Sequence, residues 1–214
     1  MKICKKIVCA VLCAVLLFSM FPVIPAFAVP ANTYYVDPNG DNSDGLSPET
    51  AFQTIQKASS ITYSEGERIL FKKGEIFYGN FTAKGSGSAK ESIIIGSYGE
   101  GAAPVLTSTV ADAPVILLSD VSYWTVSDVE ITTAEGTGIL ISFSNTTVRD
   151  ITVKNVVLHD IKNYPSETYH SGDRAALRIN GTATVDGAHA ENITVDGCEI
   201  YNCGYGIFTG GNYA

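Results

Sequence analysis

Side chains suited to chemistry are concentrated between positions 163 and 178 of the 214-residue sequence. This stretch brings a histidine, carboxylates, arginines and tyrosines close together. The candidate catalytic residues are His170, Asp173, Arg174 and Arg178, and the candidate substrate-binding residues are Tyr164, Glu167 and Tyr169. Imidazole and carboxylate groups can transfer protons, and guanidinium groups can neutralise a carboxylate through paired hydrogen bonds. The tyrosine rings could stack on the flat face of a sugar.

Two reactions fit these residue types, and their spacing does not choose between them. A β-elimination needs a base, a cation that stabilises the enolate and an acid for the leaving oxygen. Hydrolysis of a glycosidic bond instead needs two carboxylates. Glu167 and Asp173 are the nearest pair, while Asp150 and Asp160 lie earlier in the chain. A third interpretation is a solvated loop in which Asp173 and Arg174 form an ordinary surface ion pair.

A second group of polar residues, nearer the N-terminus, resembles a calcium-binding loop. Its oxygen-bearing side chains are those of Asp37, Asn39, Asp41 and Asp44. A calcium loop would also have glycine at its sixth position and glutamate at its twelfth, where Asn42 and Pro48 stand. Asx turns explain the same residues without a metal. We therefore expect either a structural loop or a calcium site here.

The elements that would position these groups are indicated by a motif that occurs three times. Its copies span residues 124–134, 151–161 and 193–203. Aligned without gaps, they keep large apolar residues in the same five columns, two before and three after a polar or glycine position. Each copy therefore predicts two short strands joined by a corner.

The corner position of the motif holds Asp128, Asn155 and Gly197 in the three copies. These residue types tolerate a left-handed or tight-turn backbone. Their recurrence at one position predicts that the chain turns there in every copy.

The repeats predict how the whole domain is built. Units this short bury an apolar face only by stacking on one another. A third strand follows each copy, at 138–141, 176–179 and 206–208, and three strands per coil predict a parallel β-helix. The interval from the second copy to the third is longer than the interval from the first to the second, so the coil between them carries an insertion. That insertion contains the candidate catalytic residues, and binding groups of repeat proteins often lie on such loops.

Ahead of the repeats, the sequence predicts a cap and further strands. Strands are expected at 33–36, 67–71, 75–78, 92–95 and 104–106, with the repeating coils starting near Val115. Ser47 can cap a helix whose first residue is Pro48 and which runs to about Ile61. This amphipathic helix would cover the open end of the core, where strand edges would otherwise meet water.

The N-terminal segment, from Met1 to Ala28, has the composition of a secretory signal peptide. A basic head of three lysines precedes an apolar run from Ile7 to Met20, and positions 26–28 read Ala-Phe-Ala. This pattern predicts cleavage after Ala28, a secreted or cell-surface protein, and no membrane insertion after cleavage. After cleavage, two of the five cysteines are left in the chain, Cys198 and Cys203. They are expected to be small buried thiols or to form a disulfide.

The charge of the mature chain limits its partners. Three of the 14 Lys and Arg residues lie in the leader, which leaves 11 against 22 Asp and Glu residues and a net charge of −11. Such a chain should not bind nucleic acid or an anionic membrane non-specifically. A polyanionic glycan would need a local basic patch or a bridging cation.

Several stretches resemble the opening of the secreted right-handed parallel β-helix proteins of the pectate-lyase-like superfamily. They read Tyr34-Tyr-Val-Asp-Pro-Asn-Gly-Asp41, Asp44-Gly-Leu-Ser-Pro-Glu-Thr-Ala-Phe-Gln-Thr-Ile-Gln-Lys57, Gly66-Glu-Arg-Ile-Leu-Phe-Lys-Lys-Gly-Glu-Ile-Phe77 and Ile93-Ile-Ile-Gly-Ser-Tyr-Gly-Glu-Gly-Ala-Ala-Pro-Val-Leu106. The resemblance covers nearly all of the mature chain. It implies a polysaccharide partner, because this opening heads polysaccharide lyases, glycoside hydrolases and other surface proteins.

From this resemblance we expect one domain over residues 29–214, with an N-terminal cap at about 33–65 and coils at about 66–214. The expected function is that of a secreted carbohydrate-active protein, with a lyase acting on uronic-acid-containing glycan ahead of a glycoside hydrolase or a non-catalytic glycan-binding or adhesin-like protein. Lyases of the superfamily commonly use calcium and a Lys or Arg base, but no stretch here matches their catalytic motifs. Such proteins usually carry more coils and a C-terminal cap. We therefore expect the C-terminal end to be missing, and a full-length protein to be a monomer.

Overall fold

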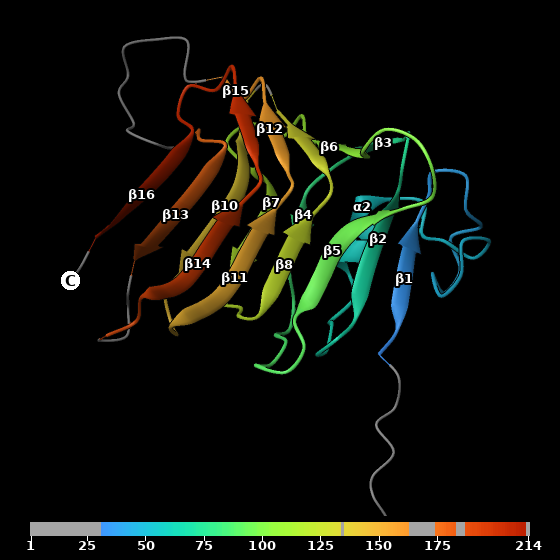
Figure 1. Ribbon diagram of the computed structural model, residues 1–214, viewed down its shortest axis with the longest axis horizontal. Helices are drawn as coiled ribbons and strands as arrows, with labels where there is room; N and C mark the ends of the chain where they lie inside the picture. The colour runs from blue at the N-terminus through green and yellow to red at the C-terminus, as the bar shows by residue number, and fades with distance from the viewer. Residues whose placement is uncertain (1–30, 134, 163–173, 183–186, 213–214) are drawn as a thin grey trace, which may run out of the picture. The chain divides into compact units, whose positions relative to one another are not determined.

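The computed structural model describes residues 31–133, 135–162, 174–182 and 187–212. Three parallel sheets contain all the described strands (Figure 1). Sheet A contains β1 (Thr33–Val36), β2 (Arg68–Lys72), β5 (Ile93–Tyr98), β8 (Trp124–Ser127), β11 (Val148–Lys154) and β14 (Ala190–Asp196). Sheet B contains β3 (Ile76–Tyr78), β6 (Val105–Thr107), β9 (Glu130–Thr132), β12 (Val157–His159) and β15 (Glu199–Tyr201). Sheet C contains β4 (Phe81–Thr82), β7 (Pro114–Ser119), β10 (Thr137–Phe143), β13 (Leu177–Thr182) and β16 (Ile207–Asn212).

The order of the strands is that of a parallel β-helix. From β2 onward the chain passes through sheet A, sheet B and sheet C in turn, and each strand pairs with the next strand of its own sheet. The predicted fold class is therefore confirmed. No helix in the described part of the chain is long and apolar enough to cross a membrane.

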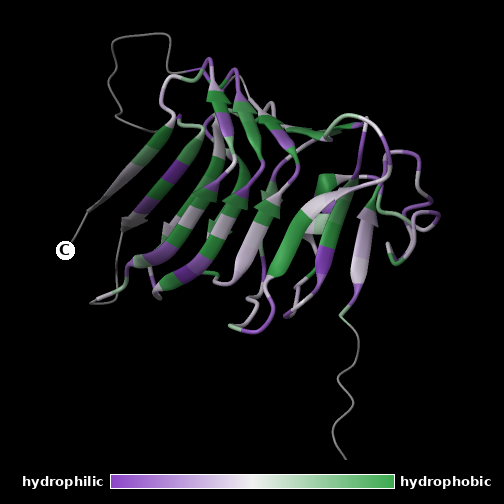
Figure 2. Ribbon diagram, in the orientation of Figure 1, coloured by the Kyte–Doolittle hydropathy of each residue, from purple (hydrophilic) through white to green (hydrophobic). Residues whose placement is uncertain are grey.

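The three copies of the motif stack in the register that the alignment predicted. Ile151 pairs with Trp124 on one side and with Ile193 on the other. Leu158 likewise lies between Ile131 and Ile200. Hydrophobic and hydrophilic residues alternate along β11 and β14 (Figure 2). Alternation turns one set of side chains into the core and the other set outward, where a site can form.

The corner between sheets A and B has the left-handed backbone that the residue types predicted. Asp128, Asn155 and Gly197 have φ angles of 56°, 52° and 61°. The Asn155 Nδ2 group donates to Asp128 Oδ1 of the preceding coil at 3.3 Å. A Cβ atom on Gly197 would lie 2.6 Å from Asn155 Oδ1, so glycine accommodates the close approach of the next coil.

Strands of successive coils already pair before Val115, where the repeating motif was expected to begin. Sheet C starts at β4, and β7 continues it across Val115. Strand β4 was not predicted, because it consists of Phe81 and Thr82 alone, which is too short to show alternation.

The predicted helix from Ser47 to about Ile61 is wrong in its extent. The helix α2 covers Ile55–Ser59, and Thr54 caps it by accepting a hydrogen bond from the Lys57 N–H. Phe52 instead exchanges backbone hydrogen bonds at 2.9 Å with the chain around Val36. This pairing with β1 holds Phe52 in a β-bridge and overrides the helix signals at Ser47 and Pro48, where the chain forms bends and a turn.

Ile55 and Ala58 of α2 are fully buried, and both belong to the same apolar core as the strands. The role of α2 as a cap over the open end of the core stays a prediction. Cys198 and Cys203 are both half-buried free thiols rather than a disulfide.

Candidate functional site

The structure bears on two of the seven predicted catalytic and binding residues. Tyr164, Glu167, Tyr169, His170 and Asp173 lie outside the described residues. Arg178 lies on β13, in register with Leu140 of β10 and Phe208 of β16. Its neighbour Leu177 is fully buried, so alternation places Arg178 on the outer face of sheet C. That position is compatible with the predicted role, which stays a prediction.

Arg174 is shielded from solvent, although the carboxylate that it contacts is exposed. Only 7% of the residue is exposed. Its Nε and Nη2 groups donate to Oδ1 of Asp112 at 3.2 and 3.0 Å. Asp112 precedes β7 on an earlier coil, so this ion pair ties the start of one sheet C strand to the segment before another. A structural contribution therefore accompanies any catalytic role of Arg174.

The four predicted calcium ligands are each engaged in local contacts. Asp37 is buried, and its carboxylate accepts from Lys72 Nζ at 2.7 Å and from the Asn39 N–H at 2.9 Å. Burial raises the pKa of Asp37, but the hydrogen bonds from Lys72 and Asn39, together with the charge of Lys72, outweigh burial and hold that pKa below its ordinary value. Asp41 and Asp44 accept from backbone N–H groups two residues on, as in Asx turns.

These contacts fit a structural loop better than a calcium site. Within the described ranges, no three or more His, Cys, Asp or Glu side chains gather at one point that could hold a metal ion. Calcium at this loop therefore remains an untested prediction, and no chemistry below depends on it.

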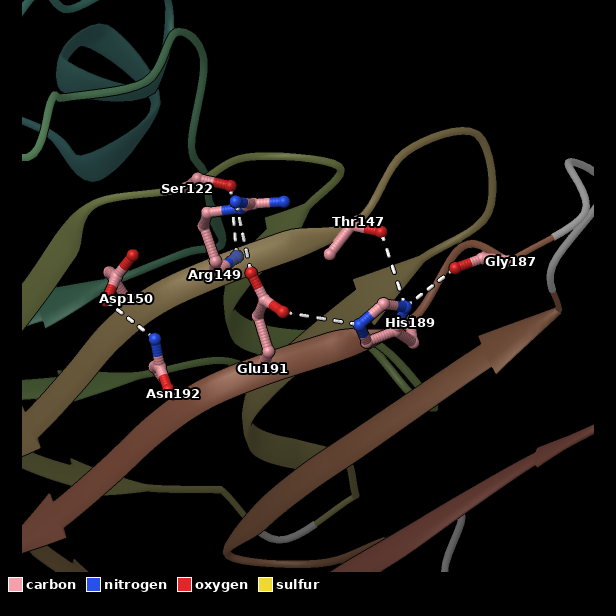
Figure 3. A network of polar contacts seen from close by, with 8 residues as sticks. All are labelled: Ser122, Thr147, Arg149, Asp150, Gly187, His189, Glu191 and Asn192. Atoms are coloured by element: carbon pink, nitrogen blue, oxygen red, sulfur yellow. Dashed lines mark hydrogen bonds and ion pairs between the residues drawn. The ribbon is translucent and has the colours of Figure 1, made fainter.

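A network of polar contacts between adjacent coils lies at the start of β11 and β14 (Figure 3). Arg149 and Glu191 form an ion pair at 3.1 Å between adjacent coils. Glu191 also lies 3.3 Å from His189 Nε2, whose Nδ1 is 2.6 Å from the Gly187 carbonyl oxygen. Both ring nitrogens of His189 donate when the ring is protonated. One carboxylate is thus shared by a guanidinium and an imidazole, groups that bind anions and transfer protons.

A polar hollow opens on the outer face of sheet A beside this network. Its volume is about 320 Å³. Its lining comes from successive coils and consists of Ser88, Ala89, Lys90, Ser92, Tyr123, Asp150, Thr152, Asn192 and Thr194. Asp150 Oδ1 accepts from Asn192 Nδ2 at 3.3 Å (Figure 3). The hollow therefore presents hydroxyl, amide and carboxylate groups, with Lys90 as its cation.

The backbone of this hollow is strained in a regular way. Tyr123, Asp150 and Asn192 immediately precede the paired core residues of β8, β11 and β14, and their φ angles are 60°, 55° and 53°. Asn and Asp adopt this conformation readily, but a bulky residue such as Tyr123 seldom does. Strain of this kind often marks a functional position, and here it places a phenol ring at the hollow.

The strain at Tyr123 can be measured with a pair of variants. Both Tyr123→Gly and Tyr123→Ala remove the ring, but only glycine adopts positive φ without a steric cost. We expect the glycine variant to be more stable than the alanine variant by about 1 kcal/mol in urea unfolding. At Thr125, two residues on in β8, the order should reverse, because glycine weakens a regular strand.

Sequence reasoning identified parts of this site without assembling them. Asp150 is named above only as a carboxylate that lies earlier in the chain, and His189 is not among the predicted site residues. The spacing between the second and third motif copies aligns Arg149 with Glu191 and Asp150 with Asn192. That alignment was the available signal, since it predicts that these pairs lie side by side.

A second polar cluster lies on the outer face of sheet B. His159 faces outward, since its neighbour Leu158 is buried, but its side chain is only 14% exposed. Its Nδ1 lies 2.8 Å from Asp160 Oδ2 and its Nε2 lies 2.9 Å from Glu130 Oε1. Burial lowers the pKa of His159, but the hydrogen bonds and charges of Asp160 and Glu130 outweigh burial and raise that pKa above 6.5.

This cluster predicts a pH dependence of stability. The folded-state pKa of His159 is raised, so its contribution is fully present below the unfolded pKa of about 6.5 and is lost as the pH rises through the folded value. The difference in unfolding free energy between the wild type and a His159→Gln variant should therefore be constant below about pH 6.5 and shrink as the pH rises above that value. A His189→Gln variant is the control for general histidine effects. A difference that is constant with pH would contradict the assignment.

Comparisons with known proteins support the fold. No family model matches the sequence, and a search of curated proteins gives no significant match. Two crystal structures of a GH136 lacto-N-biosidase from Eubacterium ramulus superpose with a TM-score of 0.67 at 20% identity, over 80% of this chain and 34% of that protein. This chain thus shares the fold and spans about a third of the length of that neighbour.

Two weaker structural matches are an alginate lyase from a Paenibacillus species and a rhamnogalacturonan lyase. The alginate lyase has a TM-score of 0.45 and 17% identity over 69% of this chain and 56% of its own. The rhamnogalacturonan lyase has a TM-score of 0.45 and 13% identity over 86% of this chain and 63% of its own.

Proposed function

We propose that this chain forms coils of a secreted carbohydrate-active protein that binds uronic-acid-containing polysaccharide in the hollow of sheet A. The observation that carries the proposal is the hollow itself, whose polar lining is supplied by successive coils. Coils lie about 4.8 Å apart, so a linear glycan laid across the strands would meet an equivalent set of side chains at each coil. Thr152 and Thr194, which pair in register, offer hydroxyls to such a chain.

Two cationic side chains lie at the hollow or next to it, and these could bind the carboxylate of an acidic sugar. Lys90 lines the hollow, and Arg149 lies on the β11 strand next to the lining residue Asp150. A mature chain with a net charge of −11 would otherwise repel a polyuronate. Binding would therefore depend on these cations and would weaken as salt is added.

The reaction class that these groups favour is a lyase-like β-elimination. In that reaction a base takes the proton next to the sugar carboxylate, the bond to the leaving oxygen breaks, and a carbon–carbon double bond forms. Lys90 and Arg149 would neutralise the carboxylate in the enolate, and Asp150 or His189 would accept or donate the proton. No additional reactant is needed, because the proton removed from carbon is balanced by the proton given to the leaving oxygen.

Glycoside hydrolysis is the second candidate, and one observation favours it. Asp150 and Glu191 place two carboxylates on adjacent coils, and Glu191 lies between Arg149 and His189. Two carboxylates are the requirement of most glycosidases. The GH136 neighbour is a lacto-N-biosidase, which makes hydrolysis worth testing in parallel.

Two readouts on the same reaction separate these activities. The secreted protein would be incubated with polygalacturonate, alginate and a neutral glucan, and both new reducing ends and the ultraviolet absorbance of unsaturated uronate would be followed. A lyase should produce both signals from a uronate polymer, whereas a hydrolase should produce reducing ends alone. If the protein is retained on a uronate polymer but gives neither signal, it binds the polymer without cleaving it, and the proposed lyase activity is excluded. Absence of retention would exclude the proposed function.

A further inference from the structure

Tyr123 lines the hollow of sheet A, but the chemistry proposed for the hollow does not use it. The residue is half-buried and lies in the lining together with Lys90 and Asp150. It belongs to an inner coil, because the strand that it precedes, β8, pairs with β5 on one side and with β11 on the other. Both coils that flank Tyr123 are therefore in place around it.

The backbone of Tyr123 is held by both neighbouring coils. Its N–H group donates to the Arg149 carbonyl at 3.0 Å, and its own carbonyl accepts from the Ile93 N–H at 2.9 Å. The loop that carries Lys90 also comes close, since a Cβ atom on Gly87 would lie 2.6 Å from the Tyr123 carbonyl oxygen. Backbone contacts therefore hold Tyr123 beside the segment that supplies the cation of the hollow.

The side chain of Tyr123 differs from a tyrosine that supports the fold. Tyr63, for example, donates its hydroxyl hydrogen to the Ala58 carbonyl at 2.7 Å and packs against aromatic rings of the core. In the described part of the chain, Tyr123 has no aromatic stacking partner and its hydroxyl makes no hydrogen bond. Its positive φ is also less favourable for tyrosine than for Asp150 and Asn192, which stand at the same position of the next two coils. The local fold would therefore be served better by an aspartate or an asparagine at this position.

We propose that Tyr123 is the residue on which a pyranose ring of the substrate stacks, with the carboxylate of that sugar bound by Lys90. The inference rests on the function proposed for the hollow, and it names the residue that orients the sugar there. One face of a pyranose carries C–H groups and packs on an aromatic ring, while its carboxylate pairs with an ammonium group. Stacking supplies affinity that does not depend on charge, and the lysine selects an acidic sugar. Because the backbone of Tyr123 is already held by its neighbours, the ring loses little entropy on binding.

Variants at position 123 separate the ring from the backbone that carries it. The probe is trigalacturonate, titrated by calorimetry, and stability is followed by urea unfolding. Tyr123→Phe keeps the ring and should bind the probe like the wild type. Tyr123→Asn removes the ring but suits a positive φ, so it should weaken binding about tenfold and yet unfold at a higher urea concentration than Tyr123→Ala. Tyr78→Ala removes an exposed tyrosine from sheet B and should leave binding unchanged.

Added salt distinguishes stacking from charge. The loss of affinity in Tyr123→Asn should persist at high salt, whereas the loss in a Lys90→Met variant should decrease. The stacking role is rejected if Tyr123→Asn binds the probe as well as the wild type does. It is also rejected if Tyr123→Phe loses as much affinity as Tyr123→Asn, because the hydroxyl rather than the ring would then carry the binding. A wild type that does not bind trigalacturonate would reject the function proposed for the hollow together with this inference, whereas full binding by Tyr123→Asn would reject the inference alone.

Discussion

A Trp124→Ala variant should lose about 3–5 kcal/mol of unfolding free energy, the usual range for truncating a fully buried aromatic residue. Trp124 is 0% exposed and lies in β8 between Ile93 and Ile151 of the neighbouring coils. Its ring packs edge-on against Tyr63, with centroids 6.0 Å apart, and its Nε1 group donates to the Gly85 carbonyl at 3.0 Å. Alanine would leave a cavity and an unsatisfied carbonyl at the same point.

The loss can be measured by urea unfolding followed by far-ultraviolet circular dichroism. A Trp124→Phe variant, which retains a ring but not the N–H donor, should lose less. Tyr78→Ala is the control for an exposed aromatic residue and should change stability little, since Tyr78 is 65% exposed. A loss below about 1 kcal/mol for Trp124→Ala would mean that the core does not pack around this residue.

A Lys90→Met variant should bind oligogalacturonate about 10–100-fold more weakly than the wild type. A hydrogen bond to a charged group contributes about 1.5–3 kcal/mol, and every 1.4 kcal/mol is about a tenfold change in affinity. Lys90 is exposed, and its backbone N–H donates to Ser88 Oγ. Methionine retains that backbone contact and most of the side-chain length, so the substitution removes little besides the charge.

The matched control is Lys154→Met. Lys154 is an exposed residue at the far end of β11, so the variant changes the net charge equally without altering the hollow. Affinities should be measured by calorimetry at two salt concentrations, because the advantage of the wild type should decrease with added salt. Equal weakening by both variants would indicate a general charge effect and would remove the support for a binding hollow.

Arg149→Met adds information about turnover. Arg149 pairs with Glu191, so its loss also releases that carboxylate toward His189. If the network takes part in catalysis, turnover should fall more than affinity. A change in affinity alone would assign Arg149 to binding.

Much of the fold could be predicted from the sequence, because local patterns that repeat along the chain specify the strands and the corners. The column of Val126, Val153 and Val195 indicated which residues face inward, and the strands pair in that register. Asp128, Asn155 and Gly197 indicated the corner. Both signals depend on side-chain alternation and backbone sterics, which act over short distances along the chain and repeat from coil to coil.

The helix shows where local signals were insufficient. Ser47 and Pro48 are good residues for a helix start, yet the chain there forms bends and a turn, and the helix begins only after Thr54. The competing interaction is the pairing of Phe52 with Val36, which lies on β1, before the intervening loop of turn-forming residues. A tertiary hydrogen bond of this kind cannot be read from propensity.

The sequence by itself determined the parallel coil, its register and the left-handed corners, since each copy of the motif specifies its own alternation and turn. Only the tertiary structure decided which polar residues meet. Tyr123, Asp150 and Asn192 are far apart in the sequence, and stacking brings them to one hollow, whereas Arg174 pairs with Asp112 of an earlier coil. The physical reason is that coil spacing converts distant sequence positions into neighbours, and the partner that an individual polar side chain finds depends on the charges that other coils present to it.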